Sequence, residues 1–204
     1  KDELPQSAAG RTVMTTEPKF IPREACTITP VEDVSMKIRL IDCVGFMIDG
    51  ATGVVEEGHE RLVKTPWYDY EIPFSEAAEF GTRKVIKDHS TVGIVMTTDG
   101  SIGELPRDSY KAAEAAAIDE LKKIGKPFVV VVNSKNPASK SASECVDEIK
   151  KTYATEAVSL DCEKLTLEDI NRTLELLLNS FPVNGIEFYF DRWIETLPDD
   201  NDIK

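Results

Sequence analysis

The chain has 204 residues, with 24 Lys and Arg against 37 Asp and Glu, so its formal net charge is 24 − 37 = −13. This length fits one α/β domain with a sizeable core. The acidic balance argues against non-specific nucleic-acid binding, which depends on Lys and Arg neutralising phosphates. The four cysteines form no C-x-x-C pair, which favours free thiols in a reducing compartment over a zinc or disulfide framework.

The N-terminal part of the chain reads as an irregular lead-in over residues 1–16 followed by two strands, 20–29 and 34–42. Because the connection over residues 30–33 is short, the two strands are predicted to pair antiparallel. Pro22 assigns the first strand to a sheet edge, since proline has no N–H for a central ladder. Residues 49–70 read as a long polar loop, whose aromatic far end is expected to pack down.

Strands are predicted to alternate with helices from residue 34 onward, and from residue 74 apolar periodicity predicts helices separated by short strands. Ser141 with Glu144 predicts a capping box at one helix start, and Thr166 predicts the cap of the last helix. The alternation favours a mostly parallel sheet with helices on both faces. The predicted elements are a helix at 74–88, a strand at 92–96, a helix at 110–124, a strand at 128–132, a helix at 141–153, a strand at 157–160 and a helix at 166–181.

Polar residues follow four of the predicted strands. Open α/β sheets bind ligands at the carboxyl ends of their strands, so these residues predict a site on one rim. They are Asp42 with Gly45, Asp99 with Gly100, Asn133 with Asn136, and Ser159 with Asp161.

Asp42 and Gly45 form an Asp-x-x-Gly pattern, which by itself also describes an ordinary turn after a strand. Thr15 and Thr16 lie just upstream of the hairpin that delivers Asp42. This order is typical of nucleoside triphosphatases, in which a mobile threonine reaches the metal and the γ-phosphate while a strand-end acid holds the metal shell. The glycine lets its backbone N–H approach a phosphate. Cys43 has no identifiable base and is interpreted as a small buried apolar residue.

Residues 133–136, Asn-Ser-Lys-Asn, stand where GTPases carry Asn-Lys-x-Asp, and Asn133 is the predicted nucleotide contact. Asn136 occupies the place of the aspartate that accepts two hydrogen bonds from guanine. An amide has only one acceptor oxygen, so adenine is favoured over guanine. The alternative is a plain loop after a buried strand.

No G-x-x-x-x-G-K-[ST] sequence occurs in these residues. In a doubly wound sheet the strand before that phosphate-binding loop is central. The expectation is therefore a fragment whose natural polypeptide continues upstream of Lys1. The strands that end at Asp42 and Thr97 are then expected to be unpaired on one side or paired with another chain.

Several segments resemble the ATPase domain of the stage IV sporulation protein A family over most of residues 2–182. They are Asp2–Gly10, Met14–Phe20, Ile38–Gly45, Thr65–Tyr68, Ile72–Phe74, Gly81–Ile86, Thr97–Gly100, Gly125–Phe128 and Val132–Ser134.

The resemblance implies a GTPase-related, P-loop NTPase-like domain at 1–182 that lacks its first strand and P-loop, and a link to a following domain at 183–204. It implies ATP and Mg²⁺ as cofactors. Asp42 becomes the metal-associated acid of the Walker B type, and Thr15 and Thr16 become the residues that sense the γ-phosphate and support hydrolysis. The fragment itself is expected to be inactive without the phosphate-binding loop.

The function implied by the resemblance is ATP hydrolysis that drives polymerisation into the basement layer of the spore coat. The expected location is the mother-cell cytoplasm at the outer surface of the forespore, peripheral to the membrane. The expected partners are further copies in filaments, a small amphipathic membrane-anchoring peptide and other coat proteins, with no nucleic acid. Two alternatives are a nucleotide-independent scaffold of the coat and a regulatory GTPase-like switch.

Overall fold

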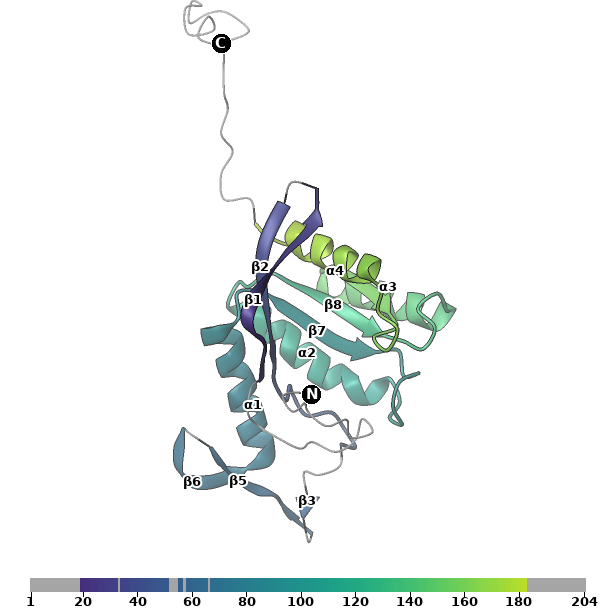
Figure 1. Cartoon of the computed structure of the whole chain (residues 1–204). Helices are drawn as coiled ribbons and strands as arrows, with labels where there is room; N and C mark the ends of the chain where they lie inside the picture. The colour runs from purple at the N-terminus through teal and green to yellow at the C-terminus, as the bar shows by residue number, and fades with distance from the viewer. Residues whose placement is uncertain (1–18, 33, 52–54, 57, 66, 183–204) are drawn as a thin grey trace, which may run out of the picture.

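The computed structural model of the chain describes residues 19–32, 34–51, 55–56, 58–65 and 67–182 (Figure 1). Within these ranges, strands and helices alternate from β6 onward, as predicted. The strands are β1 (Lys19–Val31), β2 (Val34–Asp42), β3 (Val55–Glu56), β4 (His59–Glu60), β5 (Leu62–Thr65), β6 (Tyr68–Pro73), β7 (Gly93–Thr98), β8 (Phe128–Asn133) and β9 (Ala157–Leu160). The helices are α1 (Phe74–Lys84), which continues as the π-helical turn η1 (Val85–His89), α2 (Asp108–Lys123), α3 (Lys140–Tyr153) and α4 (Leu167–Asn179).

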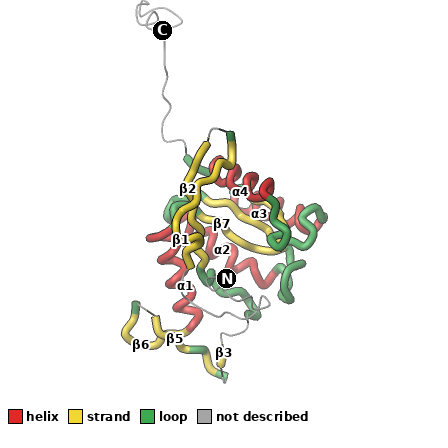
Figure 2. The backbone as a smooth tube through the Cα atoms, viewed as in Figure 1, coloured by secondary structure: helices red, strands yellow, loops and turns green. Residues whose placement is uncertain are grey.

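The centre of the fold is a parallel three-stranded sheet in the order β7-β8-β9. Alternate residues of β8 point to opposite faces, and both faces are covered (Figure 2). On one face Val130 and Val132 pack with Ile118 of α2 and Ile149 of α3. On the other face Val129 packs against α4. The predicted parallel sheet with helices on both faces is thus confirmed in a smaller, three-stranded form.

The strands β1 and β2 form a separate antiparallel hairpin, with register from Lys19 opposite Asp42 to Val31 opposite Val34. Pro22 lies in β1, which pairs only with β2, so the predicted edge position is confirmed. In the described part of the chain, β2 has no second partner strand and β7 pairs with β8 alone. The expectation that these two strands are unpaired on one side therefore holds for the described residues.

The segment predicted as a long loop over residues 49–70 contains regular structure. The short hairpins β3–β4 and β5–β6 occupy much of it (Figure 2). In the second hairpin Val63 pairs opposite the buried Ile72. The loop prediction was wrong there because burial of these branched apolar residues outweighs the polar composition of the segment. Its aromatic end does pack down, since Trp67 and Tyr68 lie 5.2 and 5.5 Å from the Phe80 ring of α1.

Two helix starts test the predicted caps. The cap of α3 is Ser139, whose Oγ accepts a hydrogen bond from the Ala142 N–H at 3.1 Å, and Ser141 lies inside the first turn. The Ser141 prediction was wrong because a side chain inside the helix cannot reach the free N–H groups ahead of it. Thr166 caps α4 as predicted, in a capping box with Asp169.

The apolar spacing of the last helix predicts one buried stripe that runs through Leu167, Ile170, Leu174, Leu177, Leu178 and Phe181. In α4 this stripe is buried only in its middle, at Leu174 and Leu177. Leu167, Ile170 and Phe181 are exposed, because the clusters beneath α4 contact only its central turns. The predicted link at 183–204 lies outside the described residues.

Candidate functional site

The carboxyl ends of β7, β8 and β9 meet on one rim, with Thr98 opposite Asn133 and Asn133 opposite Leu160. Asp99 follows β7, and its carboxylate accepts hydrogen bonds from the Ser101 N–H at 3.0 Å and from the fully buried Ser134 hydroxyl at 2.8 Å. Partial burial works to raise the pKa of the Asp99 carboxyl, but hydrogen bonds from Ser101 and Ser134 outweigh it and lower that pKa. The ends of β7 and β8 are thereby joined by side chains.

The loops after β8 and β9 are joined in the same way. The Asn133 side-chain oxygen accepts a hydrogen bond from the Cys162 N–H at 3.0 Å, and the Ser159 hydroxyl donates to the Pro137 carbonyl at 2.8 Å. The Asn136 N–H donates to the Ser134 hydroxyl at 3.2 Å, and its side chain is exposed. Asn133 therefore orders the rim, and its predicted contact with a nucleotide stays a prediction.

Asp42 and Gly45 lie at the end of β2, where the Asp42 side chain is exposed. Gly45 has φ +84°, a backbone conformation that glycine adopts without strain. Its N–H donates to the Thr82 hydroxyl and its carbonyl accepts from the same hydroxyl, each at 3.1 Å. Burial raises the pKa of the Cys43 thiol and outweighs the lowering effect of hydrogen bonding with Gly45 and Thr82. A raised thiol pKa fits the interpretation of Cys43 as an unreactive residue.

The loop after β2 reaches the start of α2, which follows the rim loop after β7. The Asp49 N–H donates to the Ser109 carbonyl at 3.1 Å, and a Cβ placed on Gly50 would lie 3.1 Å from the Leu105 side chain. The loop that carries Asp42 and the rim loop that carries Asp99 are thus in contact through their later residues.

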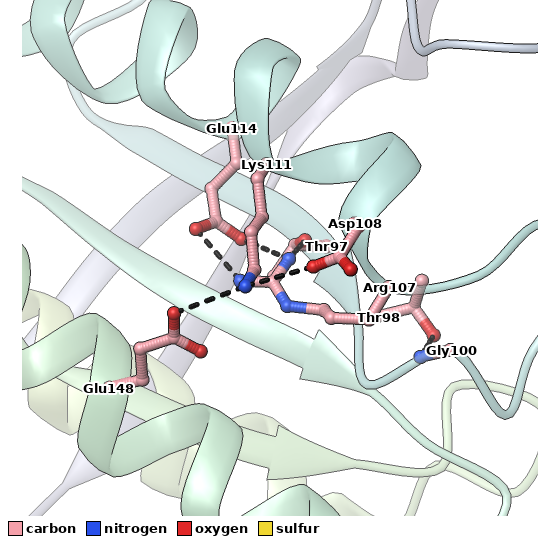
Figure 3. A network of polar contacts seen from close by, with 8 residues as sticks. All are labelled: Thr97, Thr98, Gly100, Arg107, Asp108, Lys111, Glu114 and Glu148. Atoms are coloured by element: carbon pink, nitrogen blue, oxygen red, sulfur yellow. Dashed lines mark hydrogen bonds and ion pairs between the residues drawn. The ribbon is translucent and has the colours of Figure 1, made fainter.

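An ion-pair network holds the rim loop in place (Figure 3). Arg107 makes two bonds to Glu114 of α2, at 2.7 and 2.9 Å, and donates to the Thr97 hydroxyl at 2.9 Å. The Glu114 side chain is 2% exposed. Burial works to lower the pKa of Arg107, but the hydrogen bond and charge of Glu114 outweigh it and raise that pKa. A Cβ on Gly100 would lie 2.9 Å from the Arg107 backbone N, so the close turn requires glycine.

Sequence reasoning did not find this network or Thr82. Glu114 stands within a run of alanines, where a single acid is a signal for a side chain that needs a partner if it is buried. Thr82 carries no such signal, because its contact with Gly45 spans 37 positions of the chain.

A metal site made by protein side chains alone is absent from the described ranges, where no three His, Cys, Asp or Glu residues come together. Mg²⁺ is commonly held by one or two carboxylates together with substrate phosphates, and the single exposed carboxylate of Asp42 fits that pattern. Thr15 and Thr16 lie outside the described residues.

The family model described as "Stage IV sporulation protein A, ATPase domain" matches residues 1–182. The chain belongs to the stage IV sporulation protein A family. It is 45% identical over 197 residues to stage IV sporulation protein A of Bacillus anthracis, which covers 97% of this chain and 40% of that protein. It is 42% identical over 201 residues to the Bacillus subtilis (strain 168) protein, covering 98% of this chain and 41% of that protein.

A third relative is the Clostridioides difficile (strain 630) stage IV sporulation protein A, at 43% identity over 204 residues, or all of this chain and 42% of that protein. The chain thus spans about two-fifths of the length of these stage IV sporulation proteins A. No solved structure matches it. In the part of the chain that the structure describes, every helix is too short or too polar to cross a membrane.

Proposed function

We propose that the chain binds and hydrolyses ATP with Mg²⁺, as the ATPase domain of a sporulation protein that assembles into a polymer. The observation that carries the proposal is the strand-end Asp42 with Gly45 in a chain of this family. The same loop continues to Asp49, whose N–H donates to the Ser109 carbonyl at the start of α2, just beyond the loop after β7. Strand ends of an α/β sheet are where such ligands bind.

Each candidate residue has a role in the proposal. Asp42 would hold the metal shell, and the Gly45 N–H would approach the γ-phosphate. Bound Mg²⁺ supplies charge neutralisation across the phosphates. Asn133 would contact the nucleotide or order the loops around its base, and Thr15 and Thr16 would reach the γ-phosphate.

The proposal includes a phosphate-binding loop from the portion of the protein outside these 204 residues. Two observations support it: β7 has an edge with no partner strand among the described residues, and apolar side chains are exposed nearby. Met96 of β7 is 54% exposed and Leu40 of β2 is 55% exposed. A strand inserted beside β7 would pair with its free edge and would deliver the loop to the rim, and the segments joined to that strand would cover exposed apolar side chains.

In the cell, ATP binding and hydrolysis would select a conformation that polymerises into the basement layer of the spore coat. The proposed place is the mother-cell side of the forespore surface. Further copies of the chain, a small amphipathic membrane-anchoring peptide and other coat proteins are the proposed partners.

The test is ATP turnover by the full-length protein. Asp42→Ala and the double variant Thr15→Ala with Thr16→Ala are each expected to lower kcat on the order of 100-fold. Asp69→Ala is the matched control, because Asp69 is an exposed acid of β6 outside the site, and it is expected to keep wild-type turnover. Unchanged turnover in both site variants would overturn the proposal.

Two further measurements separate the alternatives. Filament yield that is undiminished after ATP removal would favour a nucleotide-independent scaffold. Stronger competition by unlabelled GTP than by ATP would favour a GTPase-like switch.

A further inference from the structure

The N–H and carbonyl groups of Gly45 both form hydrogen bonds with one side chain of another element. Thr82 of α1 is 4% exposed, and its one hydroxyl both accepts from the Gly45 N–H and donates to the Gly45 carbonyl. The polar groups of the Gly45 peptide are therefore satisfied within the protein.

A backbone N–H makes one strong hydrogen bond, so a phosphate oxygen and the Thr82 hydroxyl compete for it. A hydrogen bond to a charged oxygen is roughly twice as strong as one between neutral groups. A γ-phosphate at this position can therefore displace the hydroxyl, while a nucleotide without that phosphate leaves it in place.

We infer that Thr82 is a positioning residue that holds the Gly45 N–H in a γ-phosphate-free arrangement and must release it when ATP binds. This inference rests on the proposed function. It deepens that function by assigning to α1 the group that makes the site distinguish ATP from ADP.

The consequence for affinity follows from which state loses a hydrogen bond. In Thr82→Val the Gly45 N–H lacks its partner when no γ-phosphate is present, and it recovers a partner when ATP binds. Affinity for a non-hydrolysable ATP analogue is then expected to increase about two- to tenfold, while affinity for ADP stays unchanged. Thr82→Ser keeps the hydroxyl and is expected to bind both nucleotides as the wild type does.

The experiment is a titration of the full-length protein with the ATP analogue and with ADP. The matched control is Thr173→Val, which removes a buried hydroxyl of α4 that donates to the Asp169 carbonyl within its own helix. Equal changes for the two nucleotides, weaker analogue binding, or a result equal to that of Thr173→Val would overturn the inference. A wild-type protein that binds neither nucleotide would instead overturn the proposed function.

If the Thr82→Val variant does not fold, the inference can be tested by a measurement on the wild-type protein. With threonine methyl groups labelled for NMR, the Thr82 resonance is expected to shift with the ATP analogue and to stay unmoved with ADP. A Thr82 resonance that responds equally to both nucleotides, or to neither in a protein that binds them, would overturn the inference.

Discussion

Two apolar strands of this chain have opposite surroundings. In β8 every residue from Phe128 to Val132 is buried, with helices on both faces. In β2 the apolar residues from Met36 to Ile41 are interrupted by Lys37 and Arg39, Leu40 is 55% exposed, and no residue of the strand is buried. Burial of an apolar strand is thus decided by the neighbours that other segments place against it.

Strand β7 has one buried face and one exposed face. Val95 faces α2 and α3 and is 7% exposed, whereas Met96 points to the other face and is 54% exposed. The sheet region, defined as β7–β9 with α2–α4, therefore buries β7 on the face covered by α2 and α3 and leaves its other face partly exposed. The hairpin region, β1–β2, contacts it chiefly through α4, where Ile28 packs on the cluster of Val129.

The largest expected effect in the sheet region comes from its buried ion pair. Arg107→Ala leaves Glu114 buried without its cation and is expected to lower the free energy of unfolding by about 3–5 kcal/mol. The control Arg83→Ala removes an exposed pair with Glu79 and is expected to cost less than about 1 kcal/mol. Denaturant unfolding measures both. The double variant Arg107→Met with Glu114→Leu should recover much of the loss, and a double variant as unstable as Arg107→Ala would contradict this account.

Truncating one apolar side chain in each region tests the difference in burial between the sheet region and the hairpin region. Ile118→Ala removes a fully buried side chain of α2 and is expected to cost about 2–4 kcal/mol in the chain of residues 1–204. Leu40→Ala in β2 is expected to cost less than about 1 kcal/mol in the same chain. In the full-length protein the Leu40→Ala cost should rise, because the proposed additional strand would cover it. An equally small cost in both chains would remove the support that the hairpin region lends to that strand.

A smaller effect is expected at the rim, and it depends on pH. The pKa of Asp99 in the folded protein lies below its usual 3.8, so its stabilising contribution is fully present above that value and is lost as pH falls through the folded pKa. Asp99→Asn should therefore lower stability at neutral pH, by less than Ile118→Ala does. The difference between variant and wild type should shrink below about pH 4. A difference that stays constant down to pH 2 would rule out the charged carboxylate as its cause.

The smallest expected effect lies at the start of α3. Ser139→Ala removes the N-cap and is expected to cost about 1 kcal/mol. Ser141→Ala, one half-turn later on the exposed surface, is expected to be neutral or slightly stabilising because alanine is the better helix former. Equal costs for the two variants in thermal unfolding would contradict the assigned cap.

Local sequence patterns were sufficient to predict elements whose type and bounds depend on their own residues. The β-branched run ending at Asn133 predicted β8, Thr166 predicted the start of α4, and the short connection over residues 30–33 predicted the β1–β2 hairpin. In the site, Asp42 ends β2 and Asn133 ends β8, as the pattern indicated. The prediction of one rim for all four strand ends was wrong for Asp42 and Gly45, because β2 pairs only with β1 in a sheet separate from β7–β9 among the described residues. The roles of these residues in binding stay predictions.

Other features depended on contacts between distant segments. On α2 the apolar spacing of the sequence predicts one face made of Tyr110, Ala113, Ala117, Leu121 and Ile124. The residue of the helix with no exposure is instead Ile118, because both β8 and α3 pack against it. The Arg107–Glu114 pair could be suspected from one acid among alanines, but its geometry arises only when the rim loop folds over α2.

The sequence by itself determined the element types and their order outside residues 49–70, the family and the strand-end position of Asp42. Those features follow from local periodicity, turn chemistry and similarity along the chain. Only the tertiary structure decided which apolar strands are buried, how the rim is joined by Asp99, Asn133 and Ser134, and that Thr82 holds Gly45. These are contacts across tens of residues, and their energies depend on which surfaces the fold brings together rather than on any neighbouring pattern.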